Sequence, residues 1–130
     1  MLFRAGRAMR EDGGTSAIEF ALVFPVFILM VLGIFEFSRA LWTRSLLNYA
    51  VQTAARCGAV DTATCGSTND TITYAVQNSS PLTVPNSDFT ASTQSCGSQV
   101  TVAFPFTFVV PQLFPFDITL SAQACYPKQT

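Results

Sequence analysis

One carboxylate stands beside an apolar run near the start of this 130-residue chain. Glu19 lies between Ile18 and Phe20, and residues 20–35 carry no charge. An ionised carboxylate within an apolar helix costs roughly several kcal/mol unless a cation or hydrogen-bond donor compensates it. Two interpretations stay open at this point. Glu19 either marks the headgroup boundary of a membrane and is solvated there, or it pairs with a cation in the working state of the protein.

The four cysteines all follow the apolar run, at positions 57, 65, 96 and 125. An even number of cysteines in a small domain favours disulfides and an oxidising compartment. Of the three possible connectivities we favour Cys57 with Cys65, which closes a short loop, and Cys96 with Cys125, which ties two strands together. A zinc site made of four thiolates is the alternative, but the chain has no Cys-x-x-Cys spacing and the compartment does not suit it.

The residue types of this chain give little support to a catalytic function. The chain has no histidine, the commonest general base and metal ligand. Its aspartates after the apolar run lie in predicted loops or strand starts, without a recognisable nucleophile, base or metal cluster: Asp61, Asp70, Asp88 and Asp117. The net charge of −1 leaves no basic surface for a phosphate backbone. We expect no enzyme, no catalytic residue, no metal, no cofactor and no nucleic-acid partner.

The composition points to a membrane. Hydrophobic residues make up 49% of the chain, charged residues 12%, and mean hydropathy is +0.37. Residues 20–35, extended by apolar neighbours, form one helix just long enough to span a bilayer. Three arginines before it and two after it bias the N-terminus only slightly toward the cytoplasm, so this orientation also rests on the cysteines: Arg4, Arg7, Arg10, Arg39 and Arg44. A cleaved secretory signal is the alternative, but no Ala-x-Ala site follows the run.

The helical pattern continues beyond the apolar run. Apolar residues recur at helical spacing on one face over residues 36–56, at Ala40, Leu47, Val51 and Ala54. Glu36 and Arg39, three residues apart, are expected to form an ordinary interfacial ion pair worth a few tenths of a kcal/mol. Trp42 is expected at the lipid–water interface. Gly58 is expected to end the helix in the left-handed conformation, and residues 61–69 form a loop.

The C-terminal region shows the clearest strand signals. Apolar residues alternate with mostly polar or small ones over residues 100–110 and again over residues 118–124, and the turn residues 111–115 between them predict an antiparallel hairpin. Pro105 predicts that the first strand is an edge strand or is broken there. Residues 72–78 fit a helix or a strand, and residues 79–95 receive no assignment. The hairpin's phenylalanines are expected to cover the long helix, although an exposed partner-binding face is the alternative.

The alternation also bears on the second disulfide. If Val100 and Leu120 share the inner face of the hairpin, Cys96 has inner parity and Cys125 outer parity. The Cys96–Cys125 bridge then requires a bulge or an irregular strand end.

The residues from Gly14 to Phe20 resemble the processing site of type IV prepilins. The motif is Gly14-Thr15-Ser16-Ala17-Ile18-Glu19-Phe20, with a basic leader before it and the apolar run after it. The resemblance implies that a membrane-embedded peptidase cuts between Gly14 and Thr15, which makes Glu19 and Phe20 the fifth and sixth residues of the mature chain. It further implies that Glu19 pairs with the new N-terminal amine of a neighbouring subunit.

Within that group, residues 13–59 resemble the TadE-like family most closely. The resemblance is carried by residues 14–22, Pro25, residues 32–41, and a last set comprising Asn48, Ala54, Ala55, Arg56 and Gly58. It implies a minor pilin-like subunit of a tight-adherence (Flp) pilus, of either the TadE or the TadF type. The implied partners are prepilin peptidase, other pilin-like subunits, the assembly machinery and the bacterial inner membrane. An uncleaved, membrane-tethered binding module is the alternative function.

Together these interpretations predict an α+β protein. Residues 1–14 are expected to be a cleaved leader and residues 15–58 a transmembrane and stalk helix. Residues 59–130 are expected to form a small extracytoplasmic domain, in which an antiparallel sheet with disulfides packs against the helix.

Overall fold

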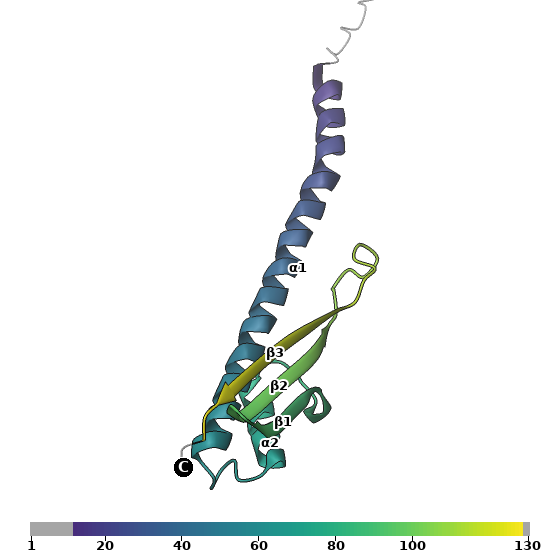
Figure 1. The fold of residues 1–130 in the computed structure, drawn as a ribbon. Coiled ribbons are helices and arrows are strands. Elements are labelled where there is room, and N and C mark those ends of the chain that lie inside the picture. Colours follow the sequence, from purple (N-terminus) through teal and green to yellow (C-terminus); the bar gives the residue numbers. More distant parts are fainter. Residues whose placement is uncertain (1–11, 129–130) are drawn as a thin grey trace, which may run out of the picture. The chain divides into compact units, whose positions relative to one another are not determined.

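The computed structural model describes residues 12–128 and confirms the α+β class. Helix α1 (Asp12–Val60) takes up more than a third of the chain and contains Pro25. The chain divides into two compact units, Met1–Phe35 and Glu36–Thr130. The described part of the first unit is helix alone. The second unit contains the rest of α1 and all the other elements (Figure 1).

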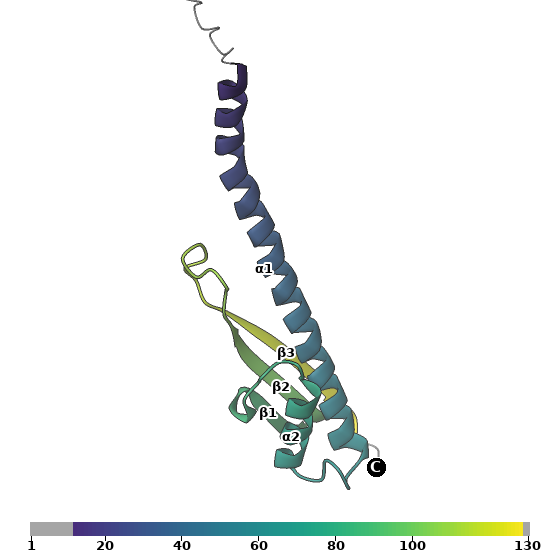
Figure 2. The same cartoon turned by 180° about the vertical axis from the view of Figure 1, so that it is seen from behind.

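The second unit combines the last turns of α1 with a short helix and a sheet. Its three strands are antiparallel in the order β1-β2-β3, which includes the predicted hairpin. Figures 1 and 2 show α2 and the sheet beside the C-terminal turns of α1. The elements after α1 are α2 (Thr68–Asn78), a 3₁₀ turn η1 (Asn86–Asp88), β1 (Phe89–Gln94), β2 (Gly97–Phe106) and β3 (Ile118–Tyr126).

Helix α2 settles the ambiguous assignment of residues 72–78. Ser67 caps its start: the Ser67 hydroxyl accepts from the backbone N–H of Asp70, and the Asp70 carboxylate accepts from the backbone N–H of Ser67. Thr71 and Ala75, one turn apart, are the buried residues of α2. The cap fixes where the helix begins, and the buried face docks it on the core.

The core lies between the C-terminal part of α1, α2 and one face of the sheet. Leu47, Val51 and Ala54 from the predicted apolar face of α1 are fully buried. Val100 and Val102 of β2 meet them, with Ala91 and Ala124 paired on either side of Val100. The even-numbered residues of β2 therefore face the helix, as the alternation predicts. The buried members of this core cluster are Leu47, Ala50, Val51, Ala54, Ala55, Ala75, Val84, Phe89, Val100, Val102 and Ala122.

Two features of α1 and β2 correct the sequence-based expectations. Gly58 does not end α1, which continues to Val60 with normal helical geometry at the glycine. A Cβ at Gly58 would lie 2.6 Å from the Ser98 hydroxyl oxygen, so the glycine allows β2 to approach the helix. The first strand of the hairpin ends at Phe106, not at residue 110, because the chain then turns into a loop built on phenylalanine contacts.

Strand β1 was not predicted. Only Phe89 is a large apolar residue in its sequence FTASTQ, so the alternation gives a weak signal, although Phe89 and Ala91 do occupy the inner face. With β1 in place, β2 is the central strand, and the prediction that it is an edge strand is wrong for most of its length. The last β1–β2 pair is Phe89 with Val102, so Pro105 lies where β2 is paired with β3 alone. A residue without an N–H is tolerated on that free side.

Candidate functional site

The predicted processing and pairing residues lie together on the first turns of α1. Gly14, Thr15, Glu19 and Phe20 are all exposed. The Phe20 ring stacks on that of Phe24 at 5.2 Å between centroids. Within the described part of the chain, Glu19 has no hydrogen bond or ion pair. The cleavage and the pairing themselves are features of interactions with other molecules and stay predictions.

Gly14 has no role in packing of the described chain. A Cβ added there meets nothing within 4 Å, and the same holds for Gly33 further along α1. A glycine inside a helix costs about 1 kcal/mol relative to alanine. The fold of this chain therefore gives no reason for a glycine at position 14.

The segment around these residues is long and apolar enough to cross a membrane. The candidate span is Gly14–Val60 of α1, an 18-residue window within it has a mean hydropathy of 2.6, and that window is not buried by the rest of the protein. Glu19 is its one ionisable side chain between residues 14 and 35. Exposed apolar side chains cover every side of this stretch, as expected of a surface in lipid.

A second carboxylate, Glu36, follows the apolar stretch and is buried. The residue is 3% exposed. Its Oε2 accepts a hydrogen bond from Arg39 Nη1 at 2.7 Å, which confirms the predicted pair. Its Oε1 accepts from the backbone N–H of Val109 at 2.6 Å, across 73 residues of sequence. Glu36 is therefore more than an ordinary interfacial partner of Arg39, because it also anchors the loop after β2.

Aromatic rings complete the surroundings of Glu36. The Arg39 guanidinium lies over the Phe106 ring, 5.2 Å from its centroid, in a cation–π contact. Phe106 is buried and contacts Phe108 edge to face at 5.4 Å. Phe108 in turn stacks on Phe114 at 5.0 Å. Phe106 thus confirms the core interpretation of the phenylalanine face, while Phe104, Phe108 and Phe114 are partly buried. No sequence signal connected these rings to Glu36.

The two favoured cysteine pairs are the pairs that the structure brings together. Cys57 and Cys65 have Cα atoms 5.7 Å apart, and Cys96 and Cys125 have Cα atoms 6.2 Å apart. Closing loops of this size restricts the unfolded chain by about 2.5 and about 3.5 kcal/mol respectively. All four sulfurs are used in these bonds, and no group of three or more candidate metal ligands occurs in the described residues.

The parity conflict at Cys96 is resolved by its position in the turn. Gln94 pairs with Gly97, so Ser95 and Cys96 form the two-residue connection between β1 and β2, outside either strand. Gly97 has φ +123°, and a Cβ there would lie 2.1 Å from the Tyr126 carbonyl oxygen. This irregular strand end allows Cys96 to reach Cys125 on the outer face.

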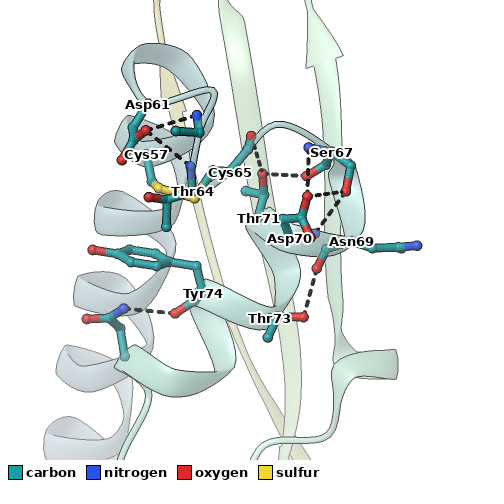
Figure 3. The surroundings of a disulfide bond; sticks show 12 residues. Cys57, Asp61, Thr64, Cys65, Ser67, Asn69, Asp70, Thr71, Thr73 and Tyr74 are labelled. Atoms are coloured by element: carbon teal, nitrogen blue, oxygen red, sulfur yellow. Dashed lines mark hydrogen bonds between the residues drawn. A yellow bond between two sulfur atoms is a disulfide. The ribbon is translucent and has the colours of Figure 1, made fainter.

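The Cys57–Cys65 loop is organised by Asp61 (Figure 3). Its Oδ1 accepts hydrogen bonds from the backbone N–H groups of Ala63 and Thr64 at 3.0 and 3.1 Å. Hydrogen bonding from the Thr64 side chain and backbone, assisted by Ala63, lowers the pKa of the Asp61 carboxyl. The Thr71 hydroxyl of α2 donates to the Cys65 carbonyl at 3.5 Å, which links the end of this loop to the first turn of α2. These contacts are those of a structural connection.

Most of helix α1 is similar to a known protein family. Residues 14–56 match the family model described as TadE-like protein. This part of the chain is similar to TadE-like proteins. The match agrees with the resemblance found in the sequence; it begins at Gly14, includes Glu19, Glu36 and Arg39, and ends directly before Cys57. The match covers about a third of the chain, and the matched residues make up most of α1. No curated protein and no solved structure was found to match the chain.

Proposed function

We propose that this chain is a minor pilin-like subunit of a tight-adherence pilus, made as a precursor that is cut between Gly14 and Thr15. The observation that carries the proposal is the TadE-like match, which begins at the glycine of the predicted site and covers a membrane-length helix. The exposed Gly14, which this fold does not require, supports recognition of that glycine by a peptidase. The protein acts in assembly and adhesion rather than in catalysis.

Cleavage supplies a cation for Glu19. The new ammonium at Thr15 is four residues from Glu19, about 6 Å along the helix axis. An incoming subunit can place its own ammonium against the Glu19 of a subunit already in the fibre. In an apolar bundle, loss of one member of such a pair costs about 3–5 kcal/mol, because the other charge stays buried without a partner. Glu19 is exposed and has no partner among residues 12–128, which fits a contact completed by assembly.

The second unit is proposed to lie outside the cytoplasm. Its two disulfides support an oxidising compartment, and the arginine-containing leader supports a cytoplasmic N-terminus in the bacterial inner membrane. The proposed partners are prepilin peptidase, other pilin-like subunits and the tight-adherence machinery. In a chain whose cleavage is blocked by Gly14→Leu, protease added to spheroplasts should cut the second unit and leave the leader intact. Degradation of the leader alone would show the opposite orientation, with the N-terminus outside the cytoplasm.

Processing is tested by the mass of the protein isolated from its host. The proposal expects a chain that starts at Thr15. Gly14→Leu should abolish the cut, because it adds bulk at the residue before the scissile bond. Gly33→Leu is the matched control, since both glycines lie on α1 with open space around the Cα. A wild-type chain that retains Arg4 and Arg7 would refute processing and favour the membrane-tethered binding module.

Pairing is tested separately at Glu19. Glu19→Gln should be cut normally but should enter sheared pili at least about tenfold less, because about 1.4 kcal/mol corresponds to a factor of ten. Glu19→Asp retains the charge and serves as the matched variant, with a smaller loss. Normal incorporation of Glu19→Gln into pili would refute the pairing role of Glu19. It would not affect the conclusion on processing, which rests on the mass of the chain.

A further inference from the structure

The loop between β2 and β3, residues 107–117, has an unusual composition for a solvent-exposed connection. Its only ionisable residue is Asp117 at the end. Its tip carries three large apolar side chains that are exposed: Val109 at 62%, Leu113 at 42% and Phe116 at 55%. We call these three residues the apolar tip. Three exposed large apolar side chains within one short loop favour contact with an apolar environment over water.

Internal contacts hold the apolar tip in a defined arrangement. Phe108 stacks on Phe114 and meets Phe116 edge to face at 5.4 Å, while Phe114 and Phe116 lie 6.1 Å apart. The backbone N–H of Leu113 donates to the Val110 carbonyl at 3.1 Å and closes a turn. Phe108 and Phe114 are half-buried, whereas Phe116 contacts both rings and still stays mostly exposed. The exposed apolar surface is therefore built into the loop.

Glu36 holds this loop beside the first residue that follows the uncharged run of α1. The residue before Glu36 is Phe35, the last of the uncharged run, and the Glu36 carboxylate binds the Val109 N–H within the second unit. The sixteen uncharged residues span about 24 Å, whereas a hydrocarbon core is about 30 Å thick. The apolar region must extend beyond the run by about one turn. On α1, exposed Phe37 and Leu41 continue the apolar surface past Glu36.

From this continuity we infer that the apolar tip inserts into the interfacial region of the lipid leaflet from which α1 emerges. Val109, Leu113 and Phe116 would lie at the boundary between headgroups and acyl chains, where aromatic and aliphatic side chains are favoured. The same geometry shields Glu36 from lipid, since the loop backbone and Arg39 satisfy both of its oxygens. The chain then has two membrane contacts, the spanning helix and this loop. The inference does not depend on leader cleavage or on pilus assembly.

The test places a fluorescent reporter at the tip of the full chain. Trp42 is the only tryptophan, so Trp42→Phe provides a silent background. Leu113→Trp reports on the loop, and Phe116→Trp is an independent second reporter. Gln94→Trp is the matched control, because exposed Gln94 pairs with the opposite end of β2, about 30 Å from Phe106 along the strand.

Each variant is reconstituted into phosphatidylcholine–phosphatidylglycerol vesicles that contain acyl-brominated lipid. The inference expects blue-shifted emission and bromine quenching of both tip reporters, with neither at position 94. Tip reporters that acrylamide quenches from the water phase as readily as the control would overturn it. Shielding that grows with the protein-to-lipid ratio, without bromine quenching, would also overturn it, since a second copy of the chain would then cover the tip.

Discussion

Replacing Glu36 with alanine is expected to release the loop after β2 while leaving the core of the second unit folded. The substitution removes the hydrogen bond that the Val109 N–H donates to a buried carboxylate at 2.6 Å. Hydrogen bonds to charged groups contribute about 1.5–3 kcal/mol. The ion pair adds little, about 0–1 kcal/mol, because the Arg39 side chain is 35% exposed. Glu36, Arg39 and Val109 do not belong to the buried cluster around Leu47. The substitution should therefore lower the free energy of local opening of the loop and not that of global unfolding.

Amide hydrogen exchange of the full chain in detergent measures this opening at the Val109 N–H itself. A loss of about 2–3 kcal/mol corresponds to roughly 30- to 150-fold faster exchange at that amide in Glu36→Ala. Glu36→Gln retains a neutral acceptor and should show a smaller acceleration, about tenfold. Glu19→Ala, the same change at an exposed glutamate without partners in the described chain, should leave Val109 unaffected. Equal exchange at Val109 in Glu36→Ala and the wild type would refute the anchoring role.

Three further predictions concern the stability of the full chain in detergent, measured by thermal or denaturant unfolding. Leu47→Ala, at a fully buried position, should lower the free energy of unfolding by about 2–5 kcal/mol. Gly97→Ala should cost about 2 kcal/mol or more, because φ is positive and the new Cβ would meet the Tyr126 carbonyl oxygen; Gly33→Ala, with open space, should not destabilise. The lowered pKa of Asp61 means that its contribution is complete above the ordinary carboxyl pKa of about 3.9 and is lost as pH falls through the folded value. The difference in stability between Asp61→Asn and the wild type should therefore shrink below about pH 4, and a constant difference would contradict the assignment.

Helices and strands in which apolar residues recur at a regular spacing were predictable from the sequence. The apolar run and the spacing of Leu47, Val51 and Ala54 predicted one long helix and its buried face. The alternation around Val100 and Val102 predicted the inner face of the hairpin. In a helix or a strand, side chains at a regular spacing share one face. The residue types at that spacing therefore indicate which face is buried. β1 escaped prediction because one buried phenylalanine is too little to establish a period.

Other features depended on approach between distant segments. Gly58 looked like a helix end because glycine is common there, but its role is to make room for Ser98 of β2. The parity of Cys96 looked unfavourable until β1 showed that this cysteine lies in a turn. The role of Gly58 depends on a strand that lies far away in the sequence and is positioned by the core. The position of Cys96 depends on β1, which directly precedes it but whose alternation is too weak to predict a strand.

Glu19 and Glu36 of α1 differ in the same way: the surroundings of Glu19 follow from the local sequence, and those of Glu36 from tertiary packing. The sequence alone determined the setting of Glu19: a glycine five residues before it and an uncharged membrane-length run after it, all within one continuous helix. Only the tertiary structure decided the setting of Glu36. Its acceptor oxygen meets a backbone N–H that lies 73 residues away, and that N–H is presented by a loop whose shape depends on stacked phenylalanines. A helix carries its own pattern along the chain, whereas a buried carboxylate acquires its partners only when the sheet packs against that helix.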